Sequence, residues 1–396
     1  MSNTIINTVE YPKKIQQNLR SALVADAIAT AMFGNVAPKQ QIVFPYMNDP
    51  RVQTYSYSGT NTVDDTVMTT DGYTIDQVKT STGNYDPVQN NLFQDMSWQD
   101  KMATQMGYQL ARNCDQYTLN TGINAAYTTV AAGTVGTSNI LQVLTASDAY
   151  MTESEAFAGD RYIVMDALTL NYLPQMDVAG GFTRADRALV AGINGYVGST
   201  SAGLKVFQSN NLPFSTVVTL ATIPTAGQTF VVKGVTFTAA ASGAAAAAGE
   251  FSIGANAAAA QVNLRAAING TGTPGATTYI ELSTPNRRIL QNSQVSCGAF
   301  GSDIATITSY GRQGITTNIA GAVLGTETFS MLAGVMGAID LTILRQPYVE
   351  ELSVSSVGAA NHSKNLIATT LFGAGVYTLR KRGLVKITAN ASTPTF

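Results

Sequence analysis

The longest apolar pattern along the chain predicts a single long helix over residues 97–119. Its apolar positions recur at helical spacing and share one side: Met96, Ala103, Met106, Leu110, Cys114 and Tyr117. Ser97 is a suitable N-cap with Asp100 three residues later, and Gly122 is a suitable stop. At about 1.5 Å per residue such a helix would be roughly 33–35 Å long.

A second helical pattern precedes it, over residues 15–33, with apolar side chains four residues apart and Gly34 as the predicted end. This segment comes before any core could exist. We therefore expect it to pack on an element formed later in the chain or on a neighbouring subunit.

Between residues 40 and 79 the pattern changes to a period of two, which predicts an extended β-ribbon. Asp71-Gly72 lies between two alternating runs and predicts a hairpin turn. Tyr55 and Tyr57 share one side of the ribbon. A two-stranded ribbon is barely stable alone, so we expect it to lie across another surface.

The chain after the long helix predicts mixed α and β structure. Strands are expected at 161–165 and 204–207, and a helix start at 167–173. The apolar stretch 328–344 predicts either one helix or a strand pair. Closing strands are expected at 375–380 and 384–388.

Residues 214–312 are rich in Ala, Thr and Gly and poor in charge, which predicts a small self-contained α+β module. Its expected elements are a hairpin at 228–238 that turns at Lys233-Gly234, a strand at 250–253, a helix at 257–268 stopped by Asn269-Gly270, and a strand at 278–282.

The amino-acid composition and the net charge limit the classes of function that this protein can have. Hydrophobic residues make up 45% of the chain and charged residues only 12%, about half the usual charged fraction. Two interpretations remain open: a surface that is covered by other protein, and a low-charge secreted protein. The formal net charge of −2 excludes a strongly basic nucleic-acid binder. The N-terminus lacks the basic-then-apolar order of a signal peptide, and no stretch predicts a membrane span.

The sequence contains no recognisable catalytic or metal-binding pattern. The single histidine, His362, lies in a polar context and excludes a histidine-rich metal site. Phosphate-loop, metalloprotease and CxxC motifs are missing. Asp64 and Asp65 are adjacent in the ribbon and would point to opposite faces, which suits neither an acid/base pair nor a cation site. The basic run 380–382 could contact phosphate, but its pattern favours a solvated turn. We expect no enzymatic activity, no cofactor and no metal. Cys114, on the apolar stripe, is expected to be a buried free thiol.

In their order along the chain, these elements resemble the major capsid protein of tailed double-stranded DNA bacteriophages, with the Hong Kong 97 fold. The local motifs that carry the resemblance are Ile42-Val-Phe-Pro45, Arg51-Val52 with Tyr55, Tyr73-Thr-Ile-Asp-Gln77, Asp86 with Gln89, Gln109-Leu-Ala-Arg112 with Asp115, and Gly203-Leu-Lys-Val-Phe-Gln-Ser-Asn-Asn-Leu-Pro213. It covers roughly residues 15–213 and 325–390.

The resemblance implies an α+β fold with a defined division. Its parts are an N-arm at 1–44, an extended loop at 45–79, a peripheral domain with the spine helix at 80–122 and 346–396, an axial domain at 123–213 and 313–345, and an inserted domain at 214–312.

The resemblance also implies a function: self-assembly as hexamers and pentamers into the icosahedral shell of a virion, formed in the bacterial cytoplasm. Implied partners are a portal protein, a decoration protein and packaged double-stranded DNA bound without sequence specificity. Two departures from the family matter. The chain lacks a long charged helical N-terminal segment, so a separate scaffolding protein is implied. The loop body has no lysine, with Lys39 and Lys79 only at its base, which argues against covalent cross-linking.

Two other functions remain as alternatives: a cargo-enclosing nanocompartment of the encapsulin type, and a secreted fibre or surface-layer subunit. For the shell, the expected contacts between subunits are Tyr55, Tyr57, Asp64, Asp65, Asp71, Gly72 and Trp98. Trp98→Ala is predicted to impair assembly more than subunit folding. Equal losses of thermal stability in the isolated subunit and in the shell would contradict this.

Overall fold

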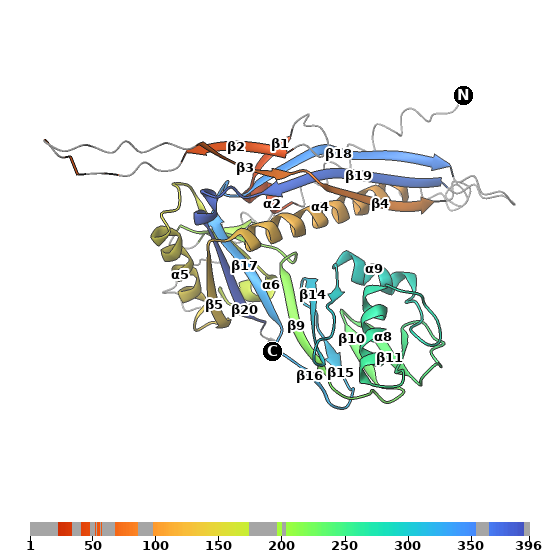
Figure 1. Ribbon diagram of the computed structural model, residues 1–396. Coiled ribbons are helices and arrows are strands. Elements are labelled where there is room, and N and C mark those ends of the chain that lie inside the picture. The colour runs from red at the N-terminus through yellow and green to blue at the C-terminus, as the bar shows by residue number, and fades with distance from the viewer. Residues whose placement is uncertain are drawn as a thin grey trace, which may run out of the picture.

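The long helix α4 (Trp98–Ala125) lies beneath a four-stranded sheet, and two further bodies lie below the helix (Figure 1). The computed structural model describes residues 23–33, 41–47, 52, 54, 55, 57, 68–85, 98–173, 196–199, 203–353 and 364–391. Helices and strands are both abundant there, so the fold class is α+β, as predicted.

The four-stranded sheet has the order β1-β18-β19-β4. β1 runs parallel to β18, and the other neighbours are antiparallel. Its strands are β1 (Thr30–Phe33), β4 (Gln77–Tyr85), β18 (Asp340–Ser353) and β19 (Lys364–Gly375). The apolar stripe of α4 packs on this sheet, where Ala103, Leu110 and Cys114 share a core with Leu341 and Phe372. The stripe is therefore confirmed, and Cys114 is a buried free thiol.

Gly122 does not end α4, which continues to Ala125. A Cβ at Gly122 would lie 2.5 Å from Ile339 Cδ1 and 2.9 Å from Leu332 Cδ2. The glycine therefore lets the helix approach the strands below it. The predicted helix end at Gly122 is wrong, because this position requires glycine for close packing and not for ending the helix.

The N-terminal helix predicted over residues 15–33 is mostly replaced by other structure where it is described. α2 (Ala25–Ile28) is a single turn, and residues 30–33 form β1, because pairing with β18 outweighs their helical spacing. Residues 15–22 lie outside the described residues. The expected packing on a later element is confirmed, since the backbone N–H groups of Val24 and Ala25 donate to Asp115 of α4.

A ten-stranded sheet carries the largest core, with α5 (Ile140–Glu153) and α6 (Ala167–Leu170) beside it. Its main path is β13-β14-β9-β17-β6-β8-β7, while β16 joins β9 and β20 lies between β17 and β5. Its strands are β5 (Thr128–Thr134), β6 (Arg161–Met165), β7 (Tyr196–Ser199), β8 (Lys205–Gln208), β9 (Pro213–Leu220), β13 (Ser296–Cys297), β14 (Ile304–Tyr310), β16 (Ala322–Leu324), β17 (Thr328–Val335) and β20 (Leu384–Asn390).

The apolar stretch 328–344 forms strands, but they are not a pair. β17 belongs to the ten-stranded sheet and β18 to the four-stranded sheet, so this stretch joins the two. The closing strand at 384–388 is confirmed by β20. The one predicted at 375–380 is wrong, because β19 ends at Gly375 and the 3-10 helix η3 begins at Arg380.

The module predicted at 214–312 has an apolar core of its own, which begins with Val218 and Leu220 of β9 and surrounds Phe230, Phe237, Phe251 and Leu264. The predicted hairpin, the strand near 250 and the helix ending at Gly270 are all present. The strand at 278–282 is wrong: Tyr279 forms only an isolated bridge with Phe251. The elements are β10 (Thr229–Val232), β11 (Val235–Ala240), β12 (Glu250–Ser252), α8 (Ala257–Asn269), α9 (Thr284–Asn292) and β15 (Thr316–Thr317).

Tyr162 on β6 carries a buried hydroxyl with no hydrogen-bond partner among the described residues. Burial also raises its pKa well above the ordinary range for tyrosine. Tyr162→Phe is expected to raise the free energy of unfolding of the isolated subunit by about 1 kcal/mol, because a desolvated, unbonded hydroxyl is removed. Chemical denaturation measures the change, and a loss of stability would contradict it.

Candidate functional site

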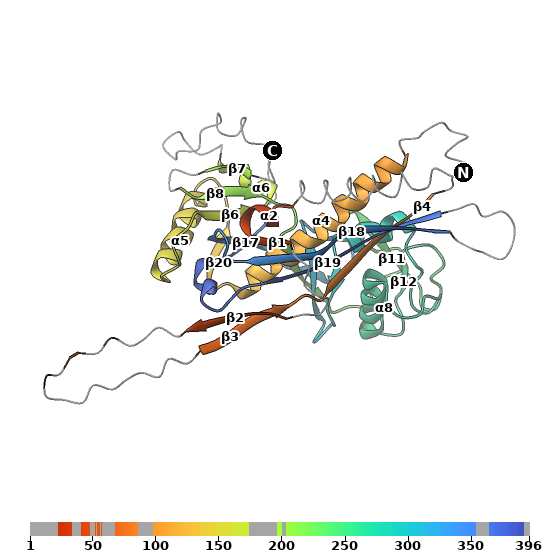
Figure 2. The same cartoon turned by 90° about the horizontal axis from the view of Figure 1, so that it is seen from above.

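A two-stranded ribbon projects from the body at the edge of the four-stranded sheet (Figures 1 and 2). It consists of β2 (Gln41–Met47) and β3 (Met68–Thr74), which pair antiparallel with Val43 opposite Gly72. The ribbon confirms the extended segment predicted from the period of two. The predicted Asp71-Gly72 turn is wrong, because both residues lie inside β3.

Gly72 is needed in β3 for close approach of the backbone. A Cβ at this position would lie 2.2 Å from the carbonyl oxygen of Ile42, a backbone atom of the paired strand. No side-chain movement can relieve that overlap. The glycine therefore permits the local pairing of the ribbon near its base.

The ribbon and the segment beyond it expose large apolar side chains. Met47 and Met68 at the ends of the strands are 54% and 65% exposed, and Tyr55 and Tyr57 further along are 74% and 95% exposed. Exposure on this scale, on an element outside every core cluster, marks a surface that the isolated chain leaves uncovered. Asp64 and Asp65 lie outside the described residues. Trp98 is the first residue of α4, and its side chain is likewise outside them.

The base of the ribbon is held to the body by Asp71. Its Oδ2 accepts hydrogen bonds from the backbone N–H and the hydroxyl of Thr378, at 2.6 and 2.7 Å. Its Oδ1 accepts from the Gly72 N–H at 2.8 Å. The hydrogen bond from the Thr378 hydroxyl is the largest cause of the lowered pKa of Asp71. The carboxylate form is therefore the one that joins β3 to the segment after β19.

Tyr73 continues this anchor into the four-stranded sheet. Its hydroxyl lies 2.6 Å from the Thr342 Oγ1 of β18, and its ring centroid is 6.2 Å from that of Tyr377. A Cβ at Gly375 would lie 2.4 Å from the Tyr73 ring, so this glycine makes room for the tyrosine. Burial is the main cause of the raised pKa of Tyr73.

Arg380 completes the anchor and is not part of a freely solvated turn. Its Nη1 donates to both carboxylate oxygens of Asp340 at 3.0 Å and to the Gly337 carbonyl at 3.0 Å. The Asp340 side chain is buried, and burial raises its pKa although Arg380 opposes that shift. The guanidinium also lies 5.4 Å from the Tyr377 ring centroid. Together, Asp71, Tyr73, Thr378, Tyr377, Arg380 and Asp340 form what we name the ribbon anchor.

The sequence draws attention to Asp71 only as a turn residue and a contact between subunits, and no pattern in it predicts the ribbon anchor. Tyr73 and Thr378 are separated by about three hundred residues, and no local pattern connects them. Gly375, two residues before Tyr377, does not reveal in the sequence that it makes room for Tyr73.

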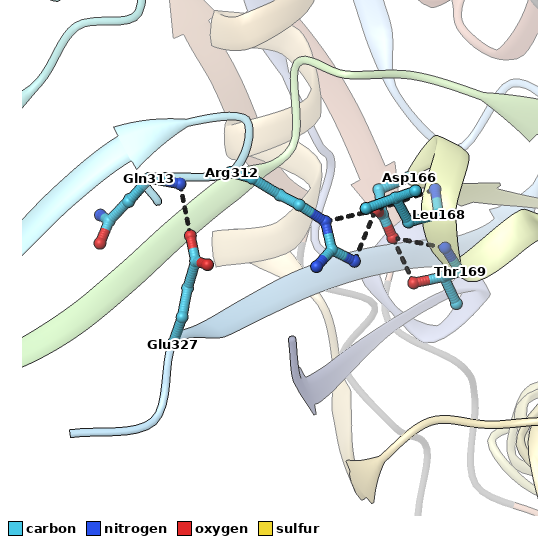
Figure 3. A network of polar contacts seen from close by, with 6 residues as sticks. All are labelled: Asp166, Leu168, Thr169, Arg312, Gln313 and Glu327. Carbon is cyan, nitrogen blue, oxygen red and sulfur yellow. Dashed lines mark hydrogen bonds and ion pairs between the residues drawn. The ribbon is translucent and has the colours of Figure 1, made fainter. Parts of the chain in front are cut away.

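A second polar network ties the exit of the separate module to β6 and α6 (Figure 3). Arg312 donates from Nε and Nη2 to Asp166 Oδ2, at 3.2 and 3.1 Å. Asp166 is the N-cap of α6 and also accepts from the Leu168 N–H and from the N–H and hydroxyl of Thr169. Next along the chain, the Gln313 N–H donates to Glu327 Oε1 at 2.5 Å. This network fixes the path by which the chain leaves the module.

Arg312→Gln is expected to lower the free energy of unfolding by about 3 kcal/mol, because it removes the charge that balances the nearly buried Asp166 carboxylate. Lys205→Gln is the matched control. Its ion pair with Asp160 is exposed on both sides, so its loss should change stability by less than about 1 kcal/mol. Equal effects of the two variants in denaturant titrations would contradict the importance of the network.

Nothing in the described residues suggests catalytic chemistry. No group of three His, Cys, Asp or Glu side chains in that part of the chain could hold a metal ion. Among the described helices, none has the length and apolar content needed to cross a membrane. The cavity bordered by Tyr127, Tyr150, Glu153 and Arg382 is open and mostly polar.

Known proteins resemble this chain in structure but not in sequence. No protein-family profile and no curated protein matches the sequence. The structure is similar to the capsid structure of the cyanophage P-SCSP1u, with a TM-score of 0.51 and 15% identity, over 94% of this chain and 90% of that chain. The capsid of Ralstonia phage GP4 gives 0.48 and 9% identity, over 93% and 88%. A chain from Mycobacterium phage Che8 gives 0.47 and 12%, over 88% and 84%. The chain therefore has the Hong Kong 97-type fold of tailed-phage capsid proteins.

Proposed function

We propose that this protein is the structural subunit of an icosahedral phage head. Copies arranged as hexamers and pentamers would enclose double-stranded DNA in the virion. The observation that carries the proposal is the ribbon, whose base is fixed by the ribbon anchor while its length exposes Met47, Met68, Tyr55 and Tyr57.

The isolated subunit leaves the apolar side chains of the ribbon exposed to water. A two-stranded ribbon with no third strand or helix behind it is barely stable in water. An anchor made of the Arg380–Asp340 ion pair, the Asp71–Thr378 hydrogen bonds and aromatic contacts gives the ribbon a direction, and a neighbouring copy can bury its apolar side chains. Subunits of closed shells bury surface on several sides, which also accounts for a charged fraction of only 12%.

The domain division follows the same proposal. α4 and the four-stranded sheet correspond to the peripheral domain, and the largest core corresponds to the axial domain. Residues 214–312 would be an inserted domain. Its support is the separate apolar core, which also includes Ile319, and the Arg312–Asp166 network where the chain returns.

Several partners belong to this function. A portal protein, a separate scaffolding protein and a decoration protein would act with the shell. The net charge of −2 suits a wall that encloses DNA without reading its sequence. In a closed shell, Tyr55, Tyr57 and the ribbon would contact the neighbouring subunit, as would Asp64, Asp65 and Trp98.

Electron microscopy of the overexpressed protein, alone and with the scaffolding protein of the same phage, tests the proposal. Icosahedral particles are expected. Native particles that protect DNA from nuclease would distinguish a phage head from a cargo-enclosing nanocompartment. Fibres or sheets without icosahedral symmetry, or subunits that never assemble under any of these conditions, would overturn it.

A further inference from the structure

Two cationic side chains, Arg112 and Lys233, lie near each other where the separate module rests on α4. Arg112 Nη2 donates to the Ser293 hydroxyl at 3.2 Å, at the end of α9. Lys233 Nζ donates to the Tyr310 carbonyl at 3.0 Å, at the end of β14. Ser293 and Tyr310 are themselves joined by a backbone hydrogen bond of 2.8 Å. The guanidinium is therefore bonded to one of these two paired residues and the ammonium group to the other.

The positive charge at this junction is incompletely balanced. Within the described part of the chain, neither Arg112 nor Lys233 forms an ion pair. Both side chains are half-buried. Burial, followed by the nearby Arg112, lowers the pKa of Lys233 to about 8, and burial also lowers the pKa of Arg112. Glu327 attracts Lys233, but its Oε1 already accepts the Gln313 N–H.

The backbone around Lys233 is adapted to this placement. Lys233 has a φ of +54°, a conformation that normally favours Gly, Asn or Asp, and it is followed by Gly234 at +75°. At Gly311, a Cβ would lie 3.2 Å from Lys233 Nζ and 2.9 Å from the Asn210 carbonyl oxygen. The two-residue hairpin turn therefore holds the Lys233 ammonium group beside Gly311, where a larger residue would crowd it.

We propose that Arg112 and Lys233 bind a tetrahedral oxyanion of the phosphate class, with the Ser293 hydroxyl as a third donor. A guanidinium has five N–H donors in a fork that suits phosphate, and within the described residues Arg112 uses only one of them. An ammonium group adds a compact second charge. The bound anion would relieve the repulsion between the two cations and join the module to α4 through Lys233 and Arg112.

Two sources supply this chemistry: free inorganic phosphate, and the phosphodiester backbone of nucleic acid. The proposed site would bind the phosphate oxygen atoms of either source in the same way. Binding of free phosphate does not depend on shell assembly, so failure of the proposed function would not remove it.

Isothermal titration calorimetry with sodium phosphate at pH 7, at ionic strength fixed by chloride, tests the site. Arg112→Gln and Lys233→Gln are each expected to weaken phosphate binding at least tenfold. The matched control is Arg288→Gln, which removes an exposed charge from α9 of the same module and should leave binding unchanged. Raising the pH to 9 should weaken binding to the unmodified protein, because Lys233 loses its proton, but not further weaken binding to Lys233→Gln.

Circular dichroism shows whether each variant is folded, and Lys233→Gln carries the test if Arg112→Gln is not. A short DNA duplex is added as competitor. Displacement of phosphate supports the site with nucleic acid as the source, and binding that the duplex does not displace supports it with free phosphate. Absence of millimolar or tighter binding, or equal binding by all four proteins, overturns the proposal.

Discussion

Gly72→Ala is expected to prevent the formation of closed particles while changing the free energy of unfolding of the unassembled subunit by less than about 1 kcal/mol. The added methyl group would overlap the Ile42 carbonyl oxygen, at 2.2 Å, so β2 and β3 cannot keep their pairing near the base of the ribbon. The ribbon lies outside the three core clusters, which is why subunit stability should be nearly unaffected. Particle yield by sedimentation and urea titration of the unassembled subunit measure the two effects.

Thr70→Ala is the matched control for this variant. Thr70 is an exposed residue of the same strand, opposite Pro45, and its truncation removes side-chain atoms without any backbone overlap. It should assemble at close to the normal yield. Normal particles from Gly72→Ala would show that the pairing of the ribbon is not required for assembly.

Asp115→Ala is expected to lower the free energy of unfolding of the isolated subunit by about 3 kcal/mol. The buried Asp115 carboxylate accepts the backbone N–H groups of Val24 and Ala25, at 3.1 and 2.9 Å, and the side-chain amide of Asn211 at 3.4 Å. Its removal would leave those two backbone donors buried without an acceptor. Asp115→Asn keeps one acceptor oxygen, so we expect a smaller loss.

The same carboxyl group should make stability depend on pH. Burial raises the pKa of Asp115 to about 7, although the hydrogen bonds from Ala25, Val24 and Asn211 oppose that shift. In the unfolded chain the pKa would be about 4. Between these two values the folded state holds the proton more tightly, so this group contributes less stability as the pH rises from about 4 to about 7. Above pH 7 its contribution is constant. The slope approaches about 1.4 kcal/mol per pH unit within that window.

Urea titrations of the unmodified protein and of Asp115→Asn across pH 4 to 8 measure this contribution as a difference. The unmodified protein should lose stability relative to Asp115→Asn as the pH rises through the window. A difference that stays constant, or one that changes in the opposite direction, would contradict the raised pKa.

Local patterns predicted the elements whose stability depends on nearby residues. The apolar face of α4 could be predicted because helical spacing places Ala103, Leu110 and Cys114 on one side of the helix. This prediction does not depend on which element packs against that side. The hairpin at Lys233-Gly234 and the helix ending at Gly270 depend on turn and cap geometry, which a few adjacent residues decide.

The errors fall where a distant partner decides the outcome. The sequence predicts a turn at Gly72 and a helix stop at Gly122, yet at both positions another segment comes too close for a side chain. Residues 30–33 have helical spacing but pair with β18, more than three hundred residues later. The strand expected at 278–282 lacks a neighbouring strand to continue its single bridge.

The candidate site divides in the same way. The ribbon segment could be predicted from the sequence, because the alternation of residue types between 40 and 79 is a local signal. Tyr55, Tyr57 and Asp71 could be picked out within it for the same reason. The ribbon anchor could not, because Asp71 meets Thr378, Tyr73 meets Thr342, and Arg380 meets Asp340 only after two sheets have formed.

By itself, the sequence determined the long helix, the extended ribbon, the module at 214–312 and the low charged fraction of the chain, and the order of the elements indicated the fold. Only the tertiary structure decided where the ribbon is fixed, why residue 72 is a glycine, and that Arg112 and Lys233 lie near each other where the module rests on α4. The reason is physical: periodicity and turn chemistry act over a few residues, whereas close backbone approach and the balance of buried charge depend on segments that folding brings together from opposite ends of the chain.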